Sequence, residues 1–355
     1  MSNTAPSLVP RWRDLIDVRP HDRDHWAALR VGLAAAGPLV LLWAIGREDL
    51  ASYAVFAAFA SVYGRNLPHL SRLRIQSIAG LAQLASVGLG GLIALSPHRY
   101  AIAIPAAAAW AFCSSLLADS VRWTPPGPLF QIFGLTSVAA VAGTPQHLGE
   151  GLVTAVASVA WALAIGYVGR LLWRSREGRL HNPYTKPIVV PPAPRGRLTR
   201  AASFGAACLI AGTIPGLIGI GHPYWAMVSV IAVLSVPDGY GRVLRAVHRF
   251  AGTMLGLAVG AGLLAFQPSG LTAIVLMILL QAGVELFVIR NYSLALVLMT
   301  PLVLLMGRLS TDLPLGALVW QRGVETAIGV AVALAVALVT VAWSASRRRV
   351  VGAAR

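Results

Sequence analysis

Apolar stretches long enough to cross a membrane recur along the whole chain. Eight of them have about 17 residues or more, the lower limit for a helix that crosses a ~30 Å hydrocarbon core: 26–46, 75–95, 100–118, 152–173, 201–221, 250–266, 271–289 and 318–343. Four shorter stretches lie between them, at 51–62, 129–142, 224–236 and 293–306. The pattern predicts an all-α polytopic membrane protein with about twelve transmembrane segments, some of them short.

A basic, proline-rich stretch separates the apolar segments into two groups of six. It reads as a semi-rigid, extended linker, because proline restricts the backbone and the charges exclude it from lipid. The expected organisation is a cytoplasmic N-terminal segment (1–25), a first six-helix half (26–173), a cytoplasmic linker (174–200), a second six-helix half (201–343) and a basic cytoplasmic tail (344–355). We expect no removable signal peptide, since the first residues mix Arg with Asp and contain no apolar core.

The two halves resemble each other when the chain is displaced against itself by 172 residues. Tyr53 then aligns with Trp225, and Gly80 aligns with Gly252. Each half has an even number of predicted crossings, so both start on the same side, which predicts two parallel repeats. The short segments fall at matching places in the two halves, a pattern that points to the binding site of a transporter. The alternative is that they are ordinary spans whose ends extend beyond the apolar stretches.

Composition and charge place the chain in a membrane and not on nucleic acid. Mean hydropathy is +0.70 and 12% of residues are charged, whereas about a quarter are charged in globular proteins. With the N-terminus inside and twelve crossings, all but four of the 29 Lys and Arg residues lie in the cytoplasm, the exceptions being Arg47, Arg99, Arg308 and Arg322. This distribution follows the positive-inside rule and predicts a multi-pass protein of the cell (inner or plasma) membrane with both termini cytoplasmic. The net charge of +16 then favours anionic lipid headgroups, and no nucleic-acid partner is expected.

One predicted helix carries arginines and small residues on a single face. At 100° per residue this face consists of Arg242, Arg245, Arg249, Gly252, Thr253, Gly256 and Gly260. Two interpretations are open, and they do not exclude each other. In the first, the arginines reach out to lipid phosphates while the glycines let a neighbouring helix pack closely. In the second, the small residues line a passage whose cationic mouth concentrates anions.

Ionisable residues inside apolar segments are costly to bury and are therefore functional candidates. Glu285 is such a residue, and as a lone carboxylate in apolar surroundings it is the leading candidate for proton coupling. The alternative is an ion pair with an arginine such as Arg249 or Arg290. Arg322 and Glu325 are spaced i and i+3 on the last segment, so we expect a local ion pair between them.

The short segments of the second half contribute further candidates. Asn291, Tyr292 and Thr300 bring hydrogen-bonding groups to one of them, where we expect substrate contacts. Trp225 begins the other, either as an aromatic anchor at the membrane interface or as a substrate contact. Phosphate-binding loops, HExxH, paired cysteines and nucleophile elbows are absent from the sequence, so we expect no enzyme activity, metal or cofactor.

Two of these stretches resemble a known family. The fusaric acid resistance protein-like family has a pattern of YW, P, G, R, R and GT, which this chain resembles in the stretch YWAMVSVIAVLSVPDGYGRVLRAVHRFAGTMLG. The later NY and TP segment of that family is similar to the stretch RNYSLALVLMTPLVLLM. That family is related to aromatic acid exporters and, more distantly, to plant aluminium-activated malate transporters. The first half has a degenerate version, SYAVFAAFASVYGRNLPHLSRLRIQSIAG, with Ser77 where the second half has Arg249.

The resemblance implies a membrane transporter that moves aromatic or other organic anions outward, driven by the proton gradient. We therefore predict proton-driven efflux of hydrophobic carboxylic acids, with Arg242, Arg245 and Arg249 receiving the carboxylate and the segments around Trp225 and Thr300 contacting the substrate. A passive organic-anion channel and a non-transporting membrane scaffold are the alternatives. Related exporters often use an adaptor protein and carry a large soluble domain. This chain has only the linker, which argues against an adaptor, and a homo-oligomer stays open.

Overall fold

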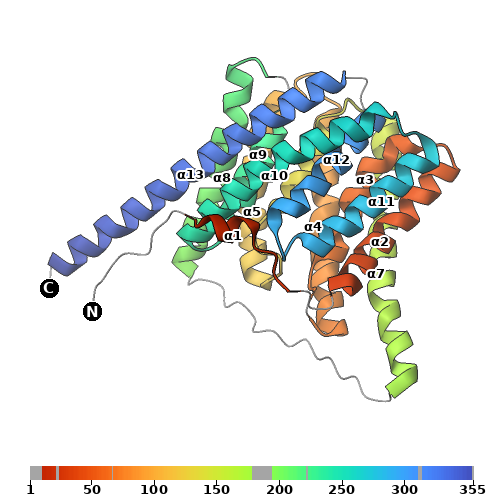
Figure 1. Cartoon of the computed structure of the whole chain (residues 1–355), viewed down its shortest axis with the longest axis horizontal. Coiled ribbons are helices and arrows are strands. Elements are labelled where there is room, and N and C mark those ends of the chain that lie inside the picture. Colours follow the sequence, from red (N-terminus) through yellow and green to blue (C-terminus); the bar gives the residue numbers. More distant parts are fainter. Residues whose placement is uncertain are drawn as a thin grey trace.

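A computed structural model describes residues 10–20, 24–65, 67–177, 194–220, 223–310 and 314–353, and this part of the chain is helical without a strand (Figure 1). The first group of helices is α1 (Trp12–Ile16), α2 (Asp24–Ala44), α3 (Ala51–Ala58), α4 (His69–Ala94), α5 (Arg99–Val121), α6 (Leu129–Ala139) and α7 (Pro145–Glu177), with 3-10 turns η1 (Glu48–Leu50) and η2 (Phe59–Val62). The second group is α8 (Pro194–Leu217), α9 (Tyr224–Leu234), α10 (Gly239–Ala265), α11 (Gly270–Phe287), α12 (Tyr292–Ser310) and α13 (Leu315–Ala353).

Eight helices of the described chain are long and apolar enough to cross a membrane: α2, α4, α5, α7, α8, α10, α11 and α13. Each of the eight long apolar stretches expected from the sequence falls on one of them. Because repeated helices of this length and composition can satisfy their backbone hydrogen bonds within lipid, the chain is a multi-pass membrane protein.

The four shorter apolar stretches form α3 with η2, α6, α9 and α12. Helix α9 has 11 residues, so it is only ~16 Å long and too short to cross lipid unaided. Every residue from Trp225 to Leu234 in this helix is buried. A helix that is apolar on all sides is buried on all sides, so α9 lies inside the bundle. The number of twelve crossings stays a prediction.

Helix neighbours in the first group have counterparts in the second. Helix α4 packs on α6 and α7, as α10 packs on α12 and α13, and α3 packs on α7 as α9 packs on α13. Between the groups, α5 lies against α8 and α11 lies against α2, while α6 meets α9 and α12 meets α3. The same set of packing relations therefore occurs twice, once around each group of short helices.

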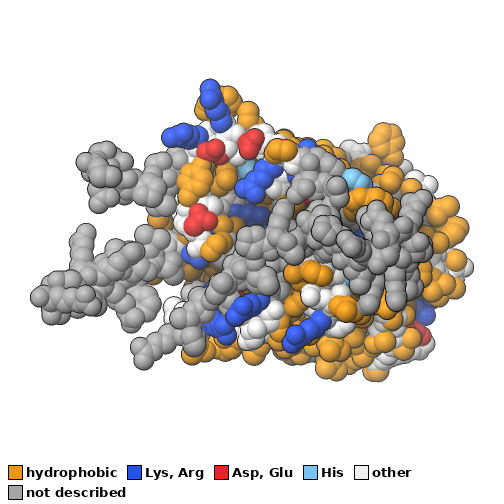
Figure 2. All heavy atoms as spheres, turned by 90° about the horizontal axis from the view of Figure 1, so that it is seen from below, with side chains coloured by type: hydrophobic (Ala, Val, Ile, Leu, Met, Phe, Trp, Pro, Cys, Tyr) orange, Lys and Arg blue, Asp and Glu red, His pale blue; other side chains and the backbone are white. Residues whose placement is uncertain are grey.

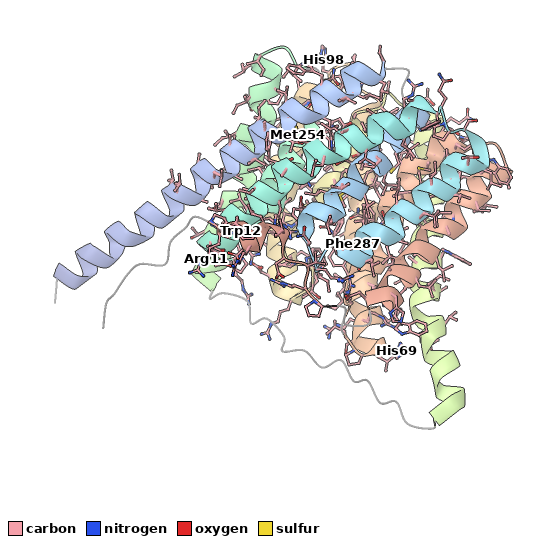
Figure 3. All side chains as sticks on the ribbon, in the orientation of Figure 1. Arg11, Trp12, His69, His98, Met254 and Phe287 are labelled. Carbon is pink, nitrogen blue, oxygen red and sulfur yellow. The ribbon has the colours of Figure 1, made fainter. Side chains whose placement is uncertain are left out.

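The two ends of the bundle differ in their charges. His69 lies at one end, with Arg11 and the first residue of α1, Trp12, on the same side, and His98 lies at the opposite end (Figure 3). We call these the α1 end and the His98 end. Seen at the α1 end, Lys and Arg side chains lie within the face together with some Asp and Glu side chains, and hydrophobic side chains occupy much of its rim (Figure 2). At the His98 end Arg47 pairs with Asp49 at 3.0 Å. Hydrogen bonds from Arg47 lower the pKa of Asp49.

Two helices continue further than the apolar stretches indicate. Helix α7 extends to Glu177 and α13 extends to Ala353, and the last turns of α13 project beyond the rest of the bundle (Figure 1). Most of the tail expected at 344–355 is therefore helical. The physical reason is that Arg, Ser and Ala continue a helix after its apolar residues end. Of the predicted linker, residues 178–193 lie outside the described residues.

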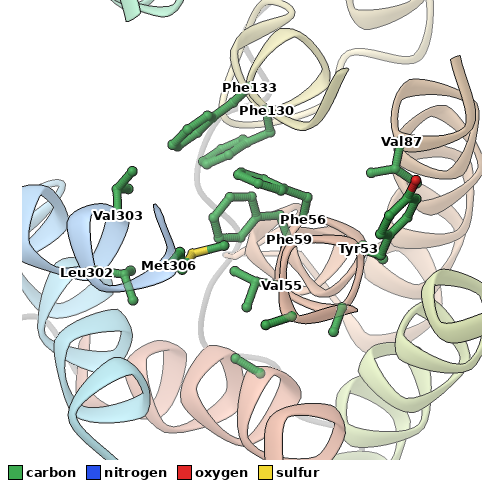
Figure 4. Packing of buried hydrophobic residues seen from close by; sticks show 14 of the residues in the cluster. Tyr53, Val55, Phe56, Phe59, Val87, Phe130, Phe133, Leu302, Val303 and Met306 are labelled. Atoms are coloured by element: carbon green, nitrogen blue, oxygen red, sulfur yellow. The ribbon is translucent and has the colours of Figure 1, made fainter. Parts of the chain in front are cut away.

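The core of the first half is aromatic. Phe56 and Phe133 have ring centroids 4.8 Å apart, and Phe59 and Phe130 have theirs 5.0 Å apart. Figure 4 shows these rings interleaved between the short helices, with Met306 of α12 beside them. Tilted and edge-on ring pairs of this kind contribute about 0.5–1.5 kcal/mol each beyond the area that they bury. This packing fixes α3 and η2 against α6.

Candidate anion site

Three arginines lie inside the second half. Arg249 of α10 and Arg322 of α13 are only 2% and 1% exposed, and Arg245, one turn before Arg249, is half-buried. Arg249 interacts electrostatically with both of the other two. Buried charges are normally paired, because desolvating an unpaired one costs several kcal/mol or more. Three like charges in one place therefore need either a counter-charge or a function.

Arg249 joins three helices. Its Nε donates to the Ser229 hydroxyl of α9 at 3.2 Å, and its Nη1 donates to the Tyr292 hydroxyl of α12 at 3.1 Å. Its Nη2 is buried and has no hydrogen-bond partner among the described residues. The side chain is thus positioned by neutral groups and retains an unused donor.

Two aromatic rings hold the other guanidinium groups. The Cζ atom of Arg245 lies 3.5 Å from the ring centroid of Tyr292, and that of Arg322 lies 3.4 Å from the ring centroid of Trp225. Stacking on a ring is favourable but leaves the N–H groups in the guanidinium plane available. Within the part of the chain that the structure describes, none of the three side-chain nitrogens of Arg322 has a hydrogen-bond partner.

Glu325 is buried beside Arg322 but is not bonded to it. Its Oε2 accepts a hydrogen bond from the backbone N–H of Trp225 at 2.9 Å, and its Oε1 has no partner among the residues described. The local ion pair predicted from the i and i+3 spacing is therefore wrong. Arg322 stacks on the indole of Trp225, while Glu325 caps the N-terminus of α9, where the helix dipole favours a negative charge.

The small-residue face of α10 packs directly on α12. An added methyl group would lie 2.6 Å from the Ser293 carbonyl oxygen at Gly252, 2.7 Å from Thr300 Cβ at Gly256 and 2.7 Å from Leu304 Cδ1 at Gly260. There is no room for a passage along this contact, so the structure favours the close-packing interpretation of the glycines. The buried hydroxyls of Thr253 and Thr300 lack hydrogen-bond partners within the described ranges.

Arg242 lies nearer to the α1 end than the other arginines of α10. It is half-buried, and its Nε donates to the Val236 carbonyl oxygen at 2.8 Å. It also lies within electrostatic reach of Arg200 of α8, which pairs with Asp119 of α5 at 3.1 Å. Cations therefore follow one another along α10 from the α1 end into the bundle.

Asn291 contacts the N-terminal segment. Its Nδ2 donates to the carbonyl oxygens of Leu15 at 3.2 Å and Asp17 at 3.0 Å, and its Oδ1 accepts from the Leu294 N–H at 3.1 Å. Nε2 of His248 also lies 3.1 Å from the Leu15 carbonyl oxygen. Residues 10–20 thus lie across the α1 end of α10 and α12. The role of Asn291 in substrate binding stays a prediction.

Glu285 is paired with an arginine that the sequence did not single out. Nη1 of Arg65 donates to Glu285 Oε1 at 2.7 Å, and Nη2 of the same guanidinium donates to Asp24 Oδ1 at 2.8 Å. The alternative interpretation, an ion pair of Glu285 with an arginine, is therefore confirmed, but the arginine is Arg65 and not Arg249 or Arg290. Arg65 follows η2 in the first half and is brought to α11 only by the tertiary fold. This triad joins α11 of the second group to α2 of the first.

A small cavity lies at the His98 end between the two halves. It measures about 60 Å³ and is lined by residues of α3, α6, α9, α12 and α13, including Phe56, Trp225 and Gln321. Trp225 also carries the guanidinium of Arg322 on its ring. The indole therefore connects the cavity with the arginine site.

The arrangement has the chemistry of an anion site. Unused guanidinium N–H groups suit a carboxylate, and the rings of Trp225 and Tyr292 suit an apolar or aromatic body attached to it. The described part of the chain contains no group of three or more His, Cys, Asp or Glu residues that could hold a metal ion. From the sequence Arg249, Tyr292 and Trp225 were expected in the site, whereas Arg322 was missed.

A comparison with known protein families concerns this second half. Residues 207–336 match the family described as fusaric acid resistance protein-like, which confirms the resemblance expected from the sequence over that range. The chain is also 30% identical over 103 residues to the "Uncharacterized membrane protein YvaC" of Bacillus subtilis (strain 168). That match covers 29% of this chain and only 16% of the relative's length. No solved structure matches the chain.

Proposed function

We propose that this membrane protein, whose residues 207–336 match the fusaric acid resistance protein-like family, exports aromatic or other hydrophobic carboxylates. The observation that carries the proposal is the pair of buried guanidinium groups with unused N–H donors, Arg249 and Arg322, beside two aromatic rings. A carboxylate supplies the missing acceptors, and charge-assisted bonds to arginine are among the strongest in proteins. The family name supports the substrate class, since fusaric acid is an aromatic carboxylic acid.

The route of the anion follows from the order of the arginines. We place the α1 end in the cytoplasm of a cell (inner or plasma) membrane protein, because cations concentrate on the cytoplasmic side. Arg242 and Arg245 then attract the anion at the cytoplasmic end of α10, and Arg249 and Arg322 hold it inside the bundle. The cavity beside Trp225 lies on the exit side. The proposal includes twelve segments arranged as two parallel six-helix repeats, supported by the helix contacts that occur twice.

Proton coupling is assigned to Glu285. Its ion pair with Arg65 connects the two halves, so protonation would neutralise Glu285 and leave the Arg65 guanidinium without one of its partners. Breaking a buried pair in this way destabilises the contact by several kcal/mol. The proton therefore acts on the contact between halves and not on the substrate itself, as a change of state in a transporter requires.

The test uses the full-length chain in proteoliposomes with a labelled aromatic carboxylate. Arg249→Ala should lower the transport rate at least about tenfold, because a charge-assisted contact to the substrate is lost. Arg290→Ala, in which the changed side chain donates to the Arg19 carbonyl oxygen outside the site, serves as the control and should transport normally. Normal transport by Arg249→Ala, inserted at the wild-type level, contradicts the proposed site.

Coupling is tested separately with Glu285→Gln. The variant should bind the carboxylate but should no longer accumulate it in response to a pH gradient, since the amide neither takes up nor releases a proton. Rates are compared with the membrane potential held at zero by a potassium ionophore. Full gradient-driven transport by Glu285→Gln removes this residue from the mechanism.

A passive organic-anion channel is the second candidate. It is favoured by the arginines themselves, which stay charged at every physiological pH, and by an inside-negative potential that expels an anion with ~2.3 kcal/mol per 100 mV. Collapsing the proton gradient with a protonophore while the potential is clamped distinguishes the two. A channel continues to pass the anion down its own gradient at the same rate, whereas a coupled exporter stops accumulating it.

A further inference from the structure

Glu325 has no part in the export scheme above, yet it lies in the same buried site as the arginines. Its Oε1 and all three nitrogens of Arg322 lack hydrogen-bond partners among the described residues, although the two side chains are one turn apart on α13. We propose that Glu325 is a built-in counter-anion that competes with the transported carboxylate for the guanidinium of Arg322. The inference rests on the proposed function, because it assumes that a carboxylate binds at these arginines.

The geometry gives Arg322 a choice of partners. Arg322 and Glu325 both contact Trp225, one at the ring at 3.4 Å and the other at the backbone N–H at 2.9 Å. Residues at i and i+3 on a helix face each other closely enough to pair when no stronger partner intervenes. An arriving carboxylate and the Glu325 carboxylate therefore require the same N–H donors, and only one of them can be fully satisfied at a time.

The charges around Glu325 determine the sign of the competition. On its own helix the nearest charge is Arg322; α9 presents Tyr224 and the Trp225 N–H, and Arg249 of α10 lies within electrostatic reach of Arg322. Helix α12 presents the Tyr292 hydroxyl to the same arginines. On α8, which also packs against α13, the charged side chains that the structure describes are Arg197 and Arg200 at the α1 end. Among these described groups, Glu325 is thus the carboxylate beside Arg322, whereas Arg200 already has Asp119 as its partner.

Protonation of Glu325 removes its charge and leaves the arginines to the substrate. Binding of the proton at Glu325 therefore favours binding of the organic anion, and by linkage each raises the affinity of the protein for the other. Ionised Glu325 lowers the affinity instead, so the competing charge weakens binding where the pH is higher. This role differs from that of Glu285, whose proton acts on the contact between halves.

The experiment measures binding of labelled benzoate to the full-length chain in lipid nanodiscs. Benzoate stays ionised between about pH 6 and about pH 8, because carboxyl groups titrate near pH ~4. The wild type should lose affinity roughly tenfold across this interval, as expected for a competing charge that shifts a titration by one unit. Glu325→Gln should bind about tenfold more tightly at the upper pH and should show no pH dependence. Glu150→Gln, which changes a carboxylate that pairs with Arg47 outside the proposed site, is the matched control and should keep the wild-type pH dependence.

Three outcomes overturn the inference. The first is that Glu325→Gln has the affinity and pH dependence of the wild type, and the second is that this variant binds benzoate more weakly at every pH. The third applies if Glu325→Gln fails to fold: Arg322→Gln, which removes the contested donor, then keeps the wild-type pH dependence. The proposed function fails in a different way, namely when the wild type neither binds nor transports benzoate at any pH. Transport by the wild type with an inert Glu325 would contradict only the inference made here.

Discussion

The two halves of the molecule use the same helix contacts but differ in the polar groups that lie beside their short helices. In the first half the Gln131 amide donates to the Tyr63 hydroxyl at 2.9 Å, and the Gln83 amide donates to the Phe130 carbonyl oxygen at 2.9 Å. Both amide nitrogens are neutral and donate a hydrogen bond, and phenylalanine rings lie around these side chains. In the second half the corresponding interior contains Arg249 and two further arginines with unused donors.

Under the proposed function, the polar groups of the first half have a structural role and the arginines of the second half bind the substrate. A buried polar group that is neutral and bonded costs little and fixes one arrangement of helices. A buried charge without its acceptors lowers stability and persists where it serves a function. Displaced by 172 residues, Ser77 and Leu73 occupy the places of Arg249 and Arg245, so the first half lacks cations at these two places. Elsewhere in the first half, Arg30 of α2 has two buried nitrogens without a hydrogen-bond partner among the described residues.

The largest effects are expected when the buried glutamine of the first half is replaced by arginine and the buried arginine of the second half by glutamine. Gln131→Arg places an unpaired charge among buried phenylalanines and should cost at least about 3–5 kcal/mol, so the protein should not accumulate in the membrane. Arg249→Gln removes an unpaired charge while keeping an amide, so its stability should be equal to the wild type or higher by ~1–2 kcal/mol, with transport lost. Thermal unfolding in detergent measures both. Equal destabilisation by the two changes would show that the second core is also purely structural.

A smaller effect is expected at two glycines that align in the two halves. Gly252→Ala brings a methyl group within 2.6 Å of the Ser293 carbonyl oxygen, a backbone atom of α12 that cannot move alone. Gly80→Ala meets Val159 Cγ1 at 2.8 Å, the tip of a side chain that can rotate. We expect Gly252→Ala to cost about 1–3 kcal/mol and to slow transport by displacing Tyr292 on α12, whereas Gly80→Ala should stay within ~1 kcal/mol of the wild type. Melting temperatures and transport rates of the two variants provide the comparison, and equal losses would contradict it.

The fold was predictable from the sequence to the extent that it depends on local pattern. All twelve apolar stretches lie on helices, because length and hydropathy act within each segment. The ends of α7 and α13 were not predictable, since backbone hydrogen bonding continues through polar residues after hydropathy has fallen. The short helices were expected at matching places, but their position inside the bundle follows from packing with other segments.

The site was predictable where a single segment determines it. The arginine face of α10 follows from helical periodicity, and Tyr292 and Trp225 were expected near it. Arg322 was not expected there, because its neighbour Glu325 suggested a local pair while the actual contact is the ring of Trp225, which comes from another helix. Likewise Arg65 lies 220 residues from Glu285 in the sequence, and no local pattern identifies such a partner.

The mildest prediction compares two buried hydroxyls, one in each half. Tyr292→Phe removes the oxygen that accepts from Arg249 at 3.1 Å but keeps the ring on which Arg245 stacks. Arg249 then loses one of the groups that orient it, so the apparent KM for the carboxylate should rise a few-fold, equivalent to ~1 kcal/mol. Tyr63→Phe removes the oxygen bonded to Gln131 and should lower stability by a similar ~1 kcal/mol while the KM stays unchanged.

The two tyrosines sharpen the comparison because the same atom is removed from two buried hydrogen bonds. If the hydroxyl of Tyr292 only stabilised the fold, both variants would lower the unfolding temperature equally and neither would change the KM. If it positions Arg249 for an anion, the two variants must differ: Tyr292→Phe changes the KM, whereas Tyr63→Phe changes the stability. An unchanged KM in Tyr292→Phe would therefore assign the second hydroxyl, like the first, to structure alone, and would leave the buried donors of Arg249 and Arg322 as the sole support for an anion site.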